Sequence, residues 1–403
     1  MKRKAGRFKE ENYLWRKGNS FELLLDGDIF FPRMVKAINS AHSFILLEMY
    51  LFESGEVAGK FIDKLCMVLK RGVRVFILLD DFGARLLKNE DKRRLIENGA
   101  QLLFFNPIEY GKWRRNLYRN HRKLLIVDNF KAYTGGAGII DEFSPRQNSS
   151  CFWHDAMIEI YGPVVADWKQ SFRKIWEESA GSPIQLPAAG PSFHSDNMYG
   201  RVACSRPGYH HEVIRALINR IRGANKYVWL STPYFLPTWK IRRALRKASQ
   251  RGVDVRLLLP GPHTDHPAIR YSGRHFYRYL LKSGVRIFEY QPRFIHSKVF
   301  MCDNWVSIGS CNLDRWSLHW NLEANQEIDD IRFAGKVEYM FQKYFTESME
   351  IDFSRWFKRP WRLRLGEYFW GTVMMWLERF LQVKSYNLKR SPSKPQVPQC
   401  RKK

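Results

Sequence analysis

Two segments of the sequence place a histidine, a lysine and an aspartate at the same spacing, His-x-Lys-x-x-x-x-Asp. Their members are His121, Lys123 and Asp128 in the first segment, and His296, Lys298 and Asp303 in the second. Residues two apart on a strand face the same side, so each histidine shares a face with its lysine. A lysine is costly to bury without a partner, which indicates an anion held beside an imidazole.

An imidazole beside a phosphate can do two kinds of chemistry. One histidine could attack phosphorus as a nucleophile. The other could protonate the leaving oxygen and later deprotonate an incoming hydroxyl. The two lysines would neutralise charge on the phosphate oxygens. The pattern therefore favours a two-histidine reaction on a phosphodiester, which requires no metal and no cofactor.

The aspartate of each segment has a different position. It lies seven residues after the histidine, an odd offset that turns it to the opposite face, roughly 20 Å along a regular strand. An asparagine follows both Asp128 and Asp303, and this pair is typical of a turn. We interpret both aspartates as structural anchors of a hairpin that do not touch the imidazoles.

Small residues follow each hairpin. The first copy has Gly135-Gly136, and the second reads Gly309-Ser310-Cys311-Asn312. A glycine such as Gly136 allows a ligand to approach the backbone, while Ser310 and Asn312 supply donors for a phosphate. A plain tight turn remains the alternative for Gly135-Gly136. Residues 263–266 contain two histidines and an aspartate, but flanking Gly and Pro favour a loop over a metal site.

The elements that position these residues also occur twice. Arg71-Gly72-Val73 is matched by Arg251-Gly252-Val253, about 180 residues later. The repeat predicts helices over 57–70 and 239–250, and strands over 43–51, 76–79, 101–105, 227–230, 256–259 and 286–289. A period this long indicates domain duplication.

Strands that alternate with helices predict an α/β fold. We expect two similar lobes with mostly parallel sheets, related by a pseudo-twofold axis, with the active site at their interface. The predicted division is a first lobe at 13–179, a linker at 180–191, a second lobe at 192–350 and a tail at 351–403. The linker is rich in Pro, Gly and Ala.

The composition constrains the partners. The 403 residues include 67 Lys and Arg against 40 Asp and Glu, a net charge of +27. This excess favours nucleic acid or an anionic membrane surface, although a basic surface can also serve solubility alone. The six cysteines form no CxxC pair, which favours a reducing, cytoplasmic setting. We find no signal peptide and no run of about 18 apolar residues.

The predicted tail carries 13 Lys and Arg, three acidic residues and a cluster of aromatic residues. This composition suits an interfacial helix lying in anionic lipid. The alternative is a terminal helix packed on the catalytic core. Residues 391–403 have a composition typical of disorder.

The duplicated motif resembles the phospholipase D superfamily, whose signature is HxKxxxxD followed by GGxN or GSxN. Further segments resemble its bacterial cardiolipin synthase branch, in a short form without amino-terminal membrane spans. They are 134–136, 141–143, 153–155, 162–163, 309–314 and 322–325. The resemblance covers roughly residues 13–345.

The resemblance implies roles for individual residues. A histidine forms a covalent phosphatidyl intermediate, and by analogy His121 is the nucleophile and His296 the general acid and base, although the order could be reversed. In relatives, an acidic residue some 25–35 positions after each motif histidine orients the imidazole of the opposite half. The matching residues are Asp155 and Glu323, for which a surface salt bridge is the alternative.

Two departures from the family pattern stand out. Gly138 occupies a position where the family usually has Asn, so one phosphate contact is expected to be missing from the first half. Five residues separate Asp303 from Gly309, where the family usually has six. A different turn type can absorb that shortening.

These observations together favour a phosphatidyltransferase that makes cardiolipin from two phosphatidylglycerols and releases glycerol. We expect it at the cytoplasmic side of the cell membrane as a peripheral protein, with anionic phospholipid as substrate and no nucleic acid partner. A phospholipase D-type hydrolase or another phosphatidyltransferase is the near alternative. A nuclease or nucleic-acid-binding protein, or a non-catalytic lipid-binding protein, is the distant one. The sequence specifies no oligomeric state.

Overall fold

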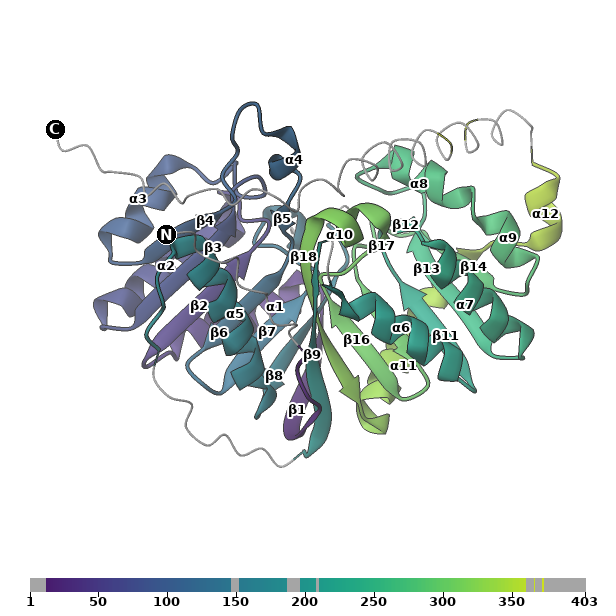
Figure 1. Ribbon diagram of the computed structural model, residues 1–403, viewed down its shortest axis with the longest axis horizontal. Helices are drawn as coiled ribbons and strands as arrows, with labels where there is room; N and C mark the ends of the chain where they lie inside the picture. The colour runs from purple at the N-terminus through teal and green to yellow at the C-terminus, as the bar shows by residue number, and fades with distance from the viewer. Residues whose placement is uncertain are drawn as a thin grey trace, which may run out of the picture.

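The computed structural model describes residues 12–145, 152–186, 196–207 and 210–359, with the single residues 366 and 372. We call residues 12–186 the first half and residues 196–359 the second half. Each half contains a sheet with helices on both faces, and the two sheets meet in the middle of the molecule (Figure 1). Most of the predicted tail, and residues 187–191 of the predicted linker, lie outside the described residues.

The first half contains eight strands and five α-helices within its described residues. The strands are β1 (Arg16–Leu25), β2 (Phe44–Met49), β3 (Arg74–Asp80), β4 (Gln101–Phe105), β5 (Arg119–Asn120), β6 (Lys123–Val127), β7 (Lys131–Gly135) and β8 (Ala156–Tyr161). The helices are α1 (Gly27–Asn39), α2 (Glu56–Lys70), α3 (Asn89–Glu97), α4 (Trp113–Asn116) and α5 (Val164–Ala180). A single 3-10 turn, η1, spans Asp141–Phe143.

The second half repeats most of this sequence of elements. Its strands are β9 (Met198–Arg206), β10 (His210–His211), β11 (Tyr227–Ser231), β12 (Phe235–Leu236), β13 (Asp254–Pro260), β14 (Arg286–Tyr290), β15 (Val299–Cys302), β16 (Trp305–Gly309), β17 (Leu313–Asp314), β18 (Asn321–Asp329) and β19 (Ser348–Glu350). Its helices are α6 (Glu212–Gly223), α7 (Trp239–Gln250), α8 (Pro267–Arg274), α9 (Tyr277–Leu281), α10 (Arg315–Trp320), α11 (Ile331–Thr346) and α12 (Phe353–Phe357).

The same strand order occurs in both halves. It is β4-β3-β2-β6-β7-β8-β1 in the first and β14-β13-β11-β15-β16-β18-β9 in the second. Only the first two pairings of each order are parallel, and the remaining four are antiparallel. The prediction of mostly parallel sheets is therefore wrong. The chain builds parallel β-α-β units first. It then forms one hairpin in each half, β6–β7 and β15–β16, which needs only a short turn, and the other antiparallel pairings join strands that no tight turn connects.

The two halves share a continuous mixed sheet. Strand β1 pairs with β8 over its second part, and its first part pairs with β9 of the second half through Arg16–Gly200 and Asn19–Met198. The register shifts between these two pairs, so β1 bends from one sheet into the other. This strand lies beside β9 at the bottom centre of Figure 1, and β9 separates it from β18.

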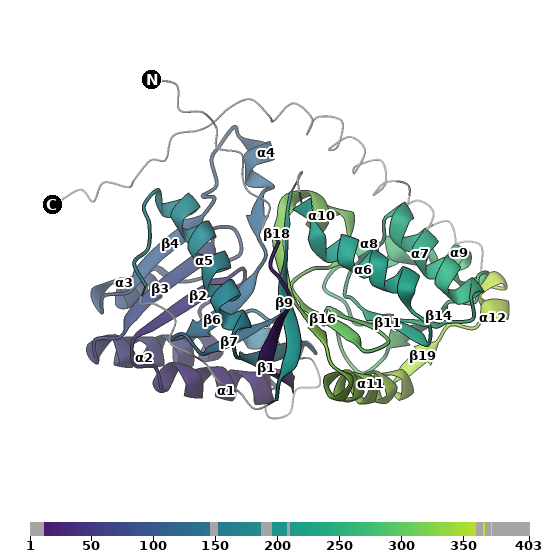
Figure 2. The ribbon, with the colours of Figure 1, turned by 60° about the horizontal axis from the view of Figure 1, so that its bottom comes forward.

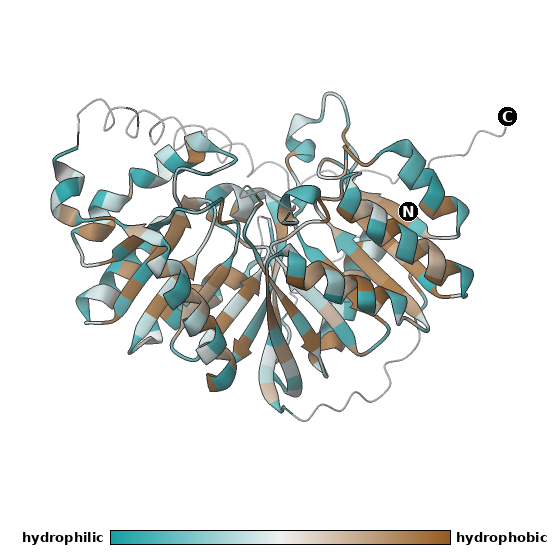
Figure 3. Cartoon of the chain, turned by 180° about the vertical axis from the view of Figure 1, so that it is seen from behind, coloured by the Kyte–Doolittle hydropathy of each residue, from teal (hydrophilic) through white to brown (hydrophobic). Residues whose placement is uncertain are grey.

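The apolar faces of the strands form three clusters of buried residues. One packs α1, α2 and α3 against the first sheet, and a second packs α6, α7 and α9 against the second sheet. The third includes α5, α11 and the remaining faces of both sheets. Figure 2 shows these helices on opposite faces, and Figure 3 shows the apolar strands between them. The third cluster joins the halves, because its members come from both.

The predicted elements are confirmed in their positions. Helix α7 coincides with its predicted range, and α2 begins one residue earlier than predicted. Gly72 and Gly252 follow these helices with φ of 85° and 89°, a left-handed conformation that glycine adopts without strain. The repeated Arg-Gly-Val segment is thus a helix end that turns the chain into the next strand.

Two further expectations concern the whole chain. The described cysteines are buried and form no disulfide bond within the described residues; they are Cys66, Cys204, Cys302 and Cys311. None of the described helices combines the length and apolarity needed to cross a bilayer.

Candidate active site

The two motif histidines are held by the backbone of the opposite half. Strand β5, just before His121, pairs with the start of β18, and the His121 N–H donates to the Leu322 carbonyl at 3.0 Å. On the other side, the His296 N–H donates to the His154 carbonyl at 2.7 Å. Leu322 directly precedes Glu323, and His154 directly precedes Asp155. Each bond therefore brings a histidine close to a carboxylate of the opposite half.

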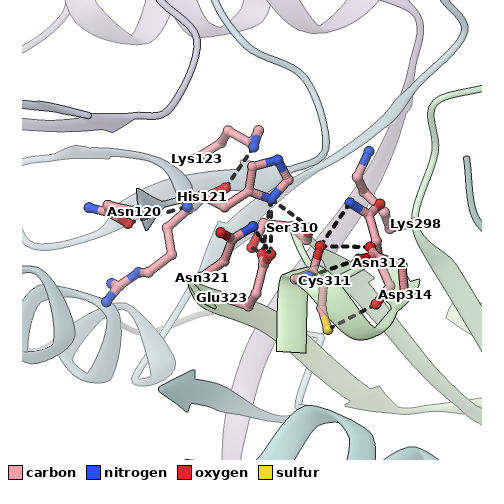
Figure 4. A network of polar contacts seen from close by, with 12 residues as sticks. Asn120, His121, Lys123, Lys298, Ser310, Cys311, Asn312, Asp314, Asn321 and Glu323 are labelled. Atoms are coloured by element: carbon pink, nitrogen blue, oxygen red, sulfur yellow. Dashed lines mark hydrogen bonds and ion pairs between the residues drawn. The ribbon is translucent and has the colours of Figure 1, made fainter. Parts of the chain in front are cut away.

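Each imidazole contacts that carboxylate through Nδ1. His121 Nδ1 lies 3.1 Å from Glu323 Oε2 and 3.2 Å from the Ser310 carbonyl. His296 Nδ1 lies 2.7 Å from Asp155 Oδ2. Figure 4 shows the first of these contacts, with His121 from one half facing Ser310 and Glu323 from the other. A carboxylate on Nδ1 fixes the tautomer, so that Nε2 carries the lone pair.

The two motif lysines are almost completely buried beside the histidines. Lys123 Nζ donates to the His121 carbonyl at 2.6 Å. Lys298 Nζ lies within 3.0 Å of both ring nitrogens of His296. Two ammonium groups and two carboxylates thus share one buried region, and their charges offset each other until an anion enters.

Burial controls the protonation of these groups. It lowers the pKa of Lys123 to about 7 and that of Lys298 to about 8, against the attraction of the carboxylates. Burial, together with the Lys298 ammonium, lowers the pKa of His296 to about 4. Burial also lowers the pKa of His121, although Glu323 opposes the shift. Both imidazoles are therefore neutral near pH 7, the form in which a nucleophile or a base acts.

Asp155 keeps its charge in this buried position. Burial alone would raise the pKa of Asp155, but the charge of Lys298 and the hydrogen bond with His296 outweigh it and lower the pKa. An ionised carboxylate can stabilise an imidazolium that forms on the neighbouring ring. The arrangement therefore equips His296 to carry a proton during a reaction.

The motif aspartates lie at the far ends of their strands. Asp128 accepts hydrogen bonds from the N–H groups of His42, Ser43 and Phe44, just before and at the start of β2. Asp303 accepts from residues 225–227 at the corresponding place before β11. These contacts hold each hairpin turn to the neighbouring strand and involve no imidazole.

The two hairpin turns differ by one residue. Val127 pairs with Lys131 across a three-residue turn, whereas Cys302 pairs with Trp305 across a two-residue turn. Asp128 and Asp303 nevertheless share a positive φ, 54° and 51°. The shortened spacing before Gly309 is thus absorbed in the turn, and the strand beyond it is unaffected.

The residues expected to bind phosphate have other partners in the structure. The Ser310 hydroxyl donates to Glu323, and the Asn312 amide donates to Ser317 Oγ at 3.4 Å. Asn312 Oδ1 is buried and has no hydrogen-bond partner among the described residues. A Cβ atom on Gly136 would lie 2.4 Å from Asp155 Oδ1. Ser310 and Gly136 therefore both lie against the carboxylates that contact the histidines.

Gly138 shows why the family's asparagine is absent from the first half. A Cβ atom there would lie 2.6 Å from Leu51 Cβ and 2.8 Å from the Leu51 carbonyl oxygen. Any larger side chain would force this backbone apart.

Two tyrosines complete the site and escaped the sequence analysis. The Tyr50 ring lies 4.7 Å from the His121 ring, and the Tyr234 ring lies 6.4 Å from that of His296. Burial raises the pKa of Tyr50 to about 12, so its hydroxyl stays protonated and can donate. Both tyrosines follow the strand that leads each duplicated unit, β2 and β11, so an alignment of the two halves could have found them.

Asp26, which contacts Asp155 and the neighbouring His154, also escaped the sequence analysis. The Asp26 N–H donates to the Asp155 carbonyl at 3.0 Å, and Asp26 Oδ1 lies 2.5 Å from His154 Nδ1. Asp26 has a φ of 63°, which is uncommon for a residue other than glycine. No spacing in the sequence links position 26 to position 155.

The segment 263–266 forms a loop between β13 and α8. Its aspartate, Asp265, accepts a hydrogen bond from the Tyr234 hydroxyl at 2.5 Å. Its contribution is thus to hold a tyrosine that borders His296. No group of His, Cys, Asp and Glu with the arrangement of a metal site occurs among the described residues.

Known proteins match both halves of the sequence. Residues 34–176 and 217–345 match the family described as "Cardiolipin synthase, PLD-like domain". A cardiolipin synthase A of Pseudomonas aeruginosa is 32% identical over 339 residues, which cover 83% of this chain and 68% of that protein. A cardiolipin synthase of Clostridium perfringens is 30% identical over 370 residues, covering 89% and 77%.

Solved structures share the fold. Phosphatidylserine synthase of Haemophilus influenzae matches with a TM-score of 0.68 at 13% identity, over 92% of this chain and 97% of that one. Polyphosphate kinase of Porphyromonas gingivalis matches with a TM-score of 0.57 at 15% identity, over 83% and 49%. The match over both halves of the sequence shows that the chain belongs to the cardiolipin synthase family of phospholipase D-like phosphatidyltransferases.

Proposed function

We propose that the chain joins two phosphatidylglycerols into cardiolipin and releases glycerol, through a phosphatidyl-histidine intermediate. The observation that carries this proposal is the crossed pairing of the histidines, His121 with Glu323 and His296 with Asp155. Such pairing requires both halves for one site and gives each imidazole a fixed tautomer. A reaction in two displacement steps uses two such groups.

In the first step, His121 Nε2 attacks the phosphorus of one phosphatidylglycerol. A P–N bond forms, the bond from phosphorus to the glycerol oxygen breaks, and a protonated His296 gives its proton to that oxygen. In the second step, neutral His296 takes the proton of a hydroxyl on a second phosphatidylglycerol. The oxygen attacks phosphorus, the P–N bond breaks, and His121 is restored.

The assignment of the nucleophile is supported by the surroundings of the rings. His296 Nε2 lies against the Lys298 ammonium, whereas His121 Nε2 has no hydrogen bond within the described part of the chain. A substrate anion would attract Lys298 away from His296 and favour the imidazolium. His296 would therefore gain its proton when substrate is bound, as a general acid must.

We assign the phosphate contacts to the lysines and to the small residues beyond the hairpins. Lys123 and Lys298 would offset the charge of the phosphodiester oxygens. The Asn312 Nδ2 carries two hydrogens and donates one to Ser317 Oγ, which leaves the other for a phosphate oxygen. Gly136 and Ser310 would contact the phosphate through their backbone, while Ser310 also holds Glu323 in place.

The proposed organisation is two phospholipase D-like lobes, at 13–179 and 192–350, related by a pseudo-twofold axis with the active site at their interface. It is supported by the repeated strand order. A linker at 180–191 and a tail at 351–403 complete this division. The net charge of +27 supports peripheral attachment to an anionic membrane surface. The absence of a disulfide bond among the described cysteines suits its cytoplasmic side.

The test is purified protein with phosphatidylglycerol vesicles, followed by mass spectrometry of the lipids. We expect cardiolipin and free glycerol in equal amounts. Phosphatidic acid as the main product would mean that water is the acceptor, so that the chain acts as a phospholipase D-type hydrolase. A reaction that yields neither cardiolipin nor phosphatidic acid would contradict the proposal.

A further inference from the structure

Five large apolar side chains lie exposed on two neighbouring loops of the first half. We call them the rim cluster, and its members are Phe82, Leu86, Ile108, Tyr110 and Trp113. Tyr110 is fully exposed, at 101% of its reference area. The loop that carries it leads into α4, which projects from one edge of the molecule in Figures 1 and 2. Apolar side chains gathered at a projecting edge mark a contact surface.

The two loops are fastened to each other and are internally ordered. The Ile108 N–H donates to Asp81 Oδ2 at 3.0 Å, which ties the second loop to the first. The Asn106 side chain donates to the carbonyls of Arg115 and Tyr118 at 2.7 Å. Asn116 Nδ2 donates to the Glu109 carbonyl at 2.8 Å. These hydrogen bonds hold the two loops in an ordered conformation, in which the apolar side chains are exposed.

Basic residues accompany the rim cluster. The two loops, residues 81–88 and 106–118, contain five Lys and Arg and two acidic residues. The Arg114 guanidinium lies 5.1 Å from the Trp113 ring, and that of Arg85 lies 4.8 Å from the Phe82 ring. Aromatic side chains mixed with cations suit the headgroup region of an anionic bilayer, where ring and charge are both accommodated.

The rim cluster also borders the active site. Gly83, next to Phe82, packs so closely on Tyr50 that a Cβ atom would lie 2.1 Å from the Tyr50 carbonyl oxygen. The Tyr50 ring in turn contacts the His121 ring. Only one residue thus separates the exposed loops from an active-site imidazole. The rim cluster therefore lies on the side of the molecule where Tyr50 packs on His121.

We propose that the rim cluster docks on an anionic phospholipid bilayer and sets the active site facing the membrane surface. Ile108, Tyr110 and Trp113 enter the headgroup region, and the neighbouring lysine and arginines contact the lipid phosphates. This inference rests on the proposed function, because it takes the substrate to be a membrane lipid. It adds a docking surface distinct from the tail.

The test compares two double variants of the full chain. Ile108→Ser/Tyr110→Ser removes apolar area from the rim cluster. Ile331→Ser/Tyr339→Ser is the matched control, because these residues are 70% and 73% exposed on α11, away from α4. Each protein is sedimented with vesicles that contain phosphatidylglycerol and with neutral phosphatidylcholine vesicles. Turnover is then measured on phosphatidylglycerol vesicles and on a short-chain phosphatidylglycerol below its micelle concentration.

We expect the rim variant to lose about tenfold or more in affinity for anionic vesicles or in vesicle turnover. It should keep its turnover of the short-chain lipid, and the control should match wild type throughout. A separate Lys112→Gln/Arg114→Gln variant should weaken binding to anionic vesicles by about fivefold per charge and leave binding to neutral vesicles unchanged.

Several results would overturn the inference. One is a rim variant that equals wild type in both vesicle binding and vesicle turnover. Another is a rim variant that changes only self-association in gel filtration, which would identify the surface as a contact between copies of the chain. The protein could also bind vesicles through the rim cluster and form no cardiolipin. That result would support the docking surface and contradict the proposed function.

Discussion

The carboxylate of Glu323 lies 3.1 Å from Nδ1 of His121, although 202 residues separate the two in the sequence. The same relationship joins His296 to Asp155, 141 residues away, in the opposite direction. Neither half therefore contains a complete catalytic unit. The backbone bonds from His121 to Leu322 and from His296 to His154 hold the pairs in register. The proposed two-histidine mechanism therefore depends on the correct docking of the halves.

The first prediction concerns Glu323. Replacing it by Gln removes the charge that stabilises an imidazolium and allows an amide to face Nδ1, which favours the wrong tautomer. We expect Glu323→Gln to lower kcat by about a hundredfold or more, with little change in the melting temperature. Glu97→Gln, at an exposed position on α3, is the control. A Glu323→Gln enzyme with wild-type kcat would show that the carboxylate has no part in the reaction.

The second prediction concerns pH. A lysine neutralises phosphate only when protonated, and the pKa values of Lys123 and Lys298 are lowered to about 7 and 8. The value of kcat/KM should therefore fall as pH rises through 7 to 8. It should also fall on the acid side, where His121, whose pKa is lowered by burial, becomes protonated.

The alkaline fall of kcat should occur at higher pH than the alkaline fall of kcat/KM. A bound phosphodiester favours the charged form of each lysine, so the complex holds its protons longer. Steady-state rates at a series of pH values give both profiles. An alkaline limb of kcat/KM that stays flat to about pH 9 would exclude the lysines as the groups that titrate.

The third prediction concerns Asp128 and Asp303. Each carboxylate accepts three backbone N–H bonds and sits where the chain has a positive φ, which asparagine also tolerates. We expect either Asp→Asn variant to lose about 1–3 kcal/mol of stability and to keep its rate per folded molecule. Thermal melting and kcat, measured on the same sample, separate the two effects. Normal melting with lost turnover would contradict this structural role.

The fourth prediction concerns Gly136. A methyl group there would collide with the Asp155 carboxylate at 2.4 Å and turn it away from His296. We expect Gly136→Ala to reduce kcat by about tenfold or more. Gly59→Ala on α2 is the matched control, since a Cβ atom there meets nothing within 4 Å. Equal rates in the two variants would mean that the Asp155 position does not limit turnover.

The fifth prediction concerns the tail. Removing residues 360–403 deletes ten Lys and Arg and two acidic residues, so vesicle binding should weaken while the fold is retained. A cut at Ser354 would also remove Trp356, whose buried ring lies 5.1 Å from that of Tyr277. Losing this ring would lower the free energy of unfolding by about 3–5 kcal/mol. The shorter deletion therefore isolates the effect on binding. Unchanged partitioning to anionic vesicles would exclude the tail as an anchor.

The sequence reveals the chemistry of this chain better than its architecture. The repeats around Gly72 and Gly252 predict the helices and strands because they are local features. The two hairpins, β6–β7 and β15–β16, are also local and were expected from the Asp-Asn turns. The antiparallel pairings β2–β6, β1–β8, β11–β15 and β9–β18 join strands far apart in the sequence, so the parallel sheets that β-α-β alternation suggested are mixed sheets.

The site shows the same division. The spacing of His121 and Lys123 indicates phosphate chemistry, because side chains two residues apart in an extended segment face the same side. In the structure Lys123 begins β6 and His121 lies just before it. Asp26 and Tyr50 carry no such spacing and reach His154 and His121 through the folding of the first half. The pairing of Asp155 and Glu323 with the opposite histidines came from resemblance, since periodicity within one strand contains no information about a partner in another domain.

The most direct test of the central claim, that two imidazoles act on one phosphorus, is the capture of the intermediate. A phosphatidyl ester of p-nitrophenol needs no acid for its leaving group, so a His296→Asn variant should still react once. We predict a burst of one nitrophenolate per chain and a phosphatidyl group bound to His121 in the mass spectrum, with no burst in His121→Asn. A His296→Asn enzyme that turns over steadily, or that carries no group on His121, would contradict the account.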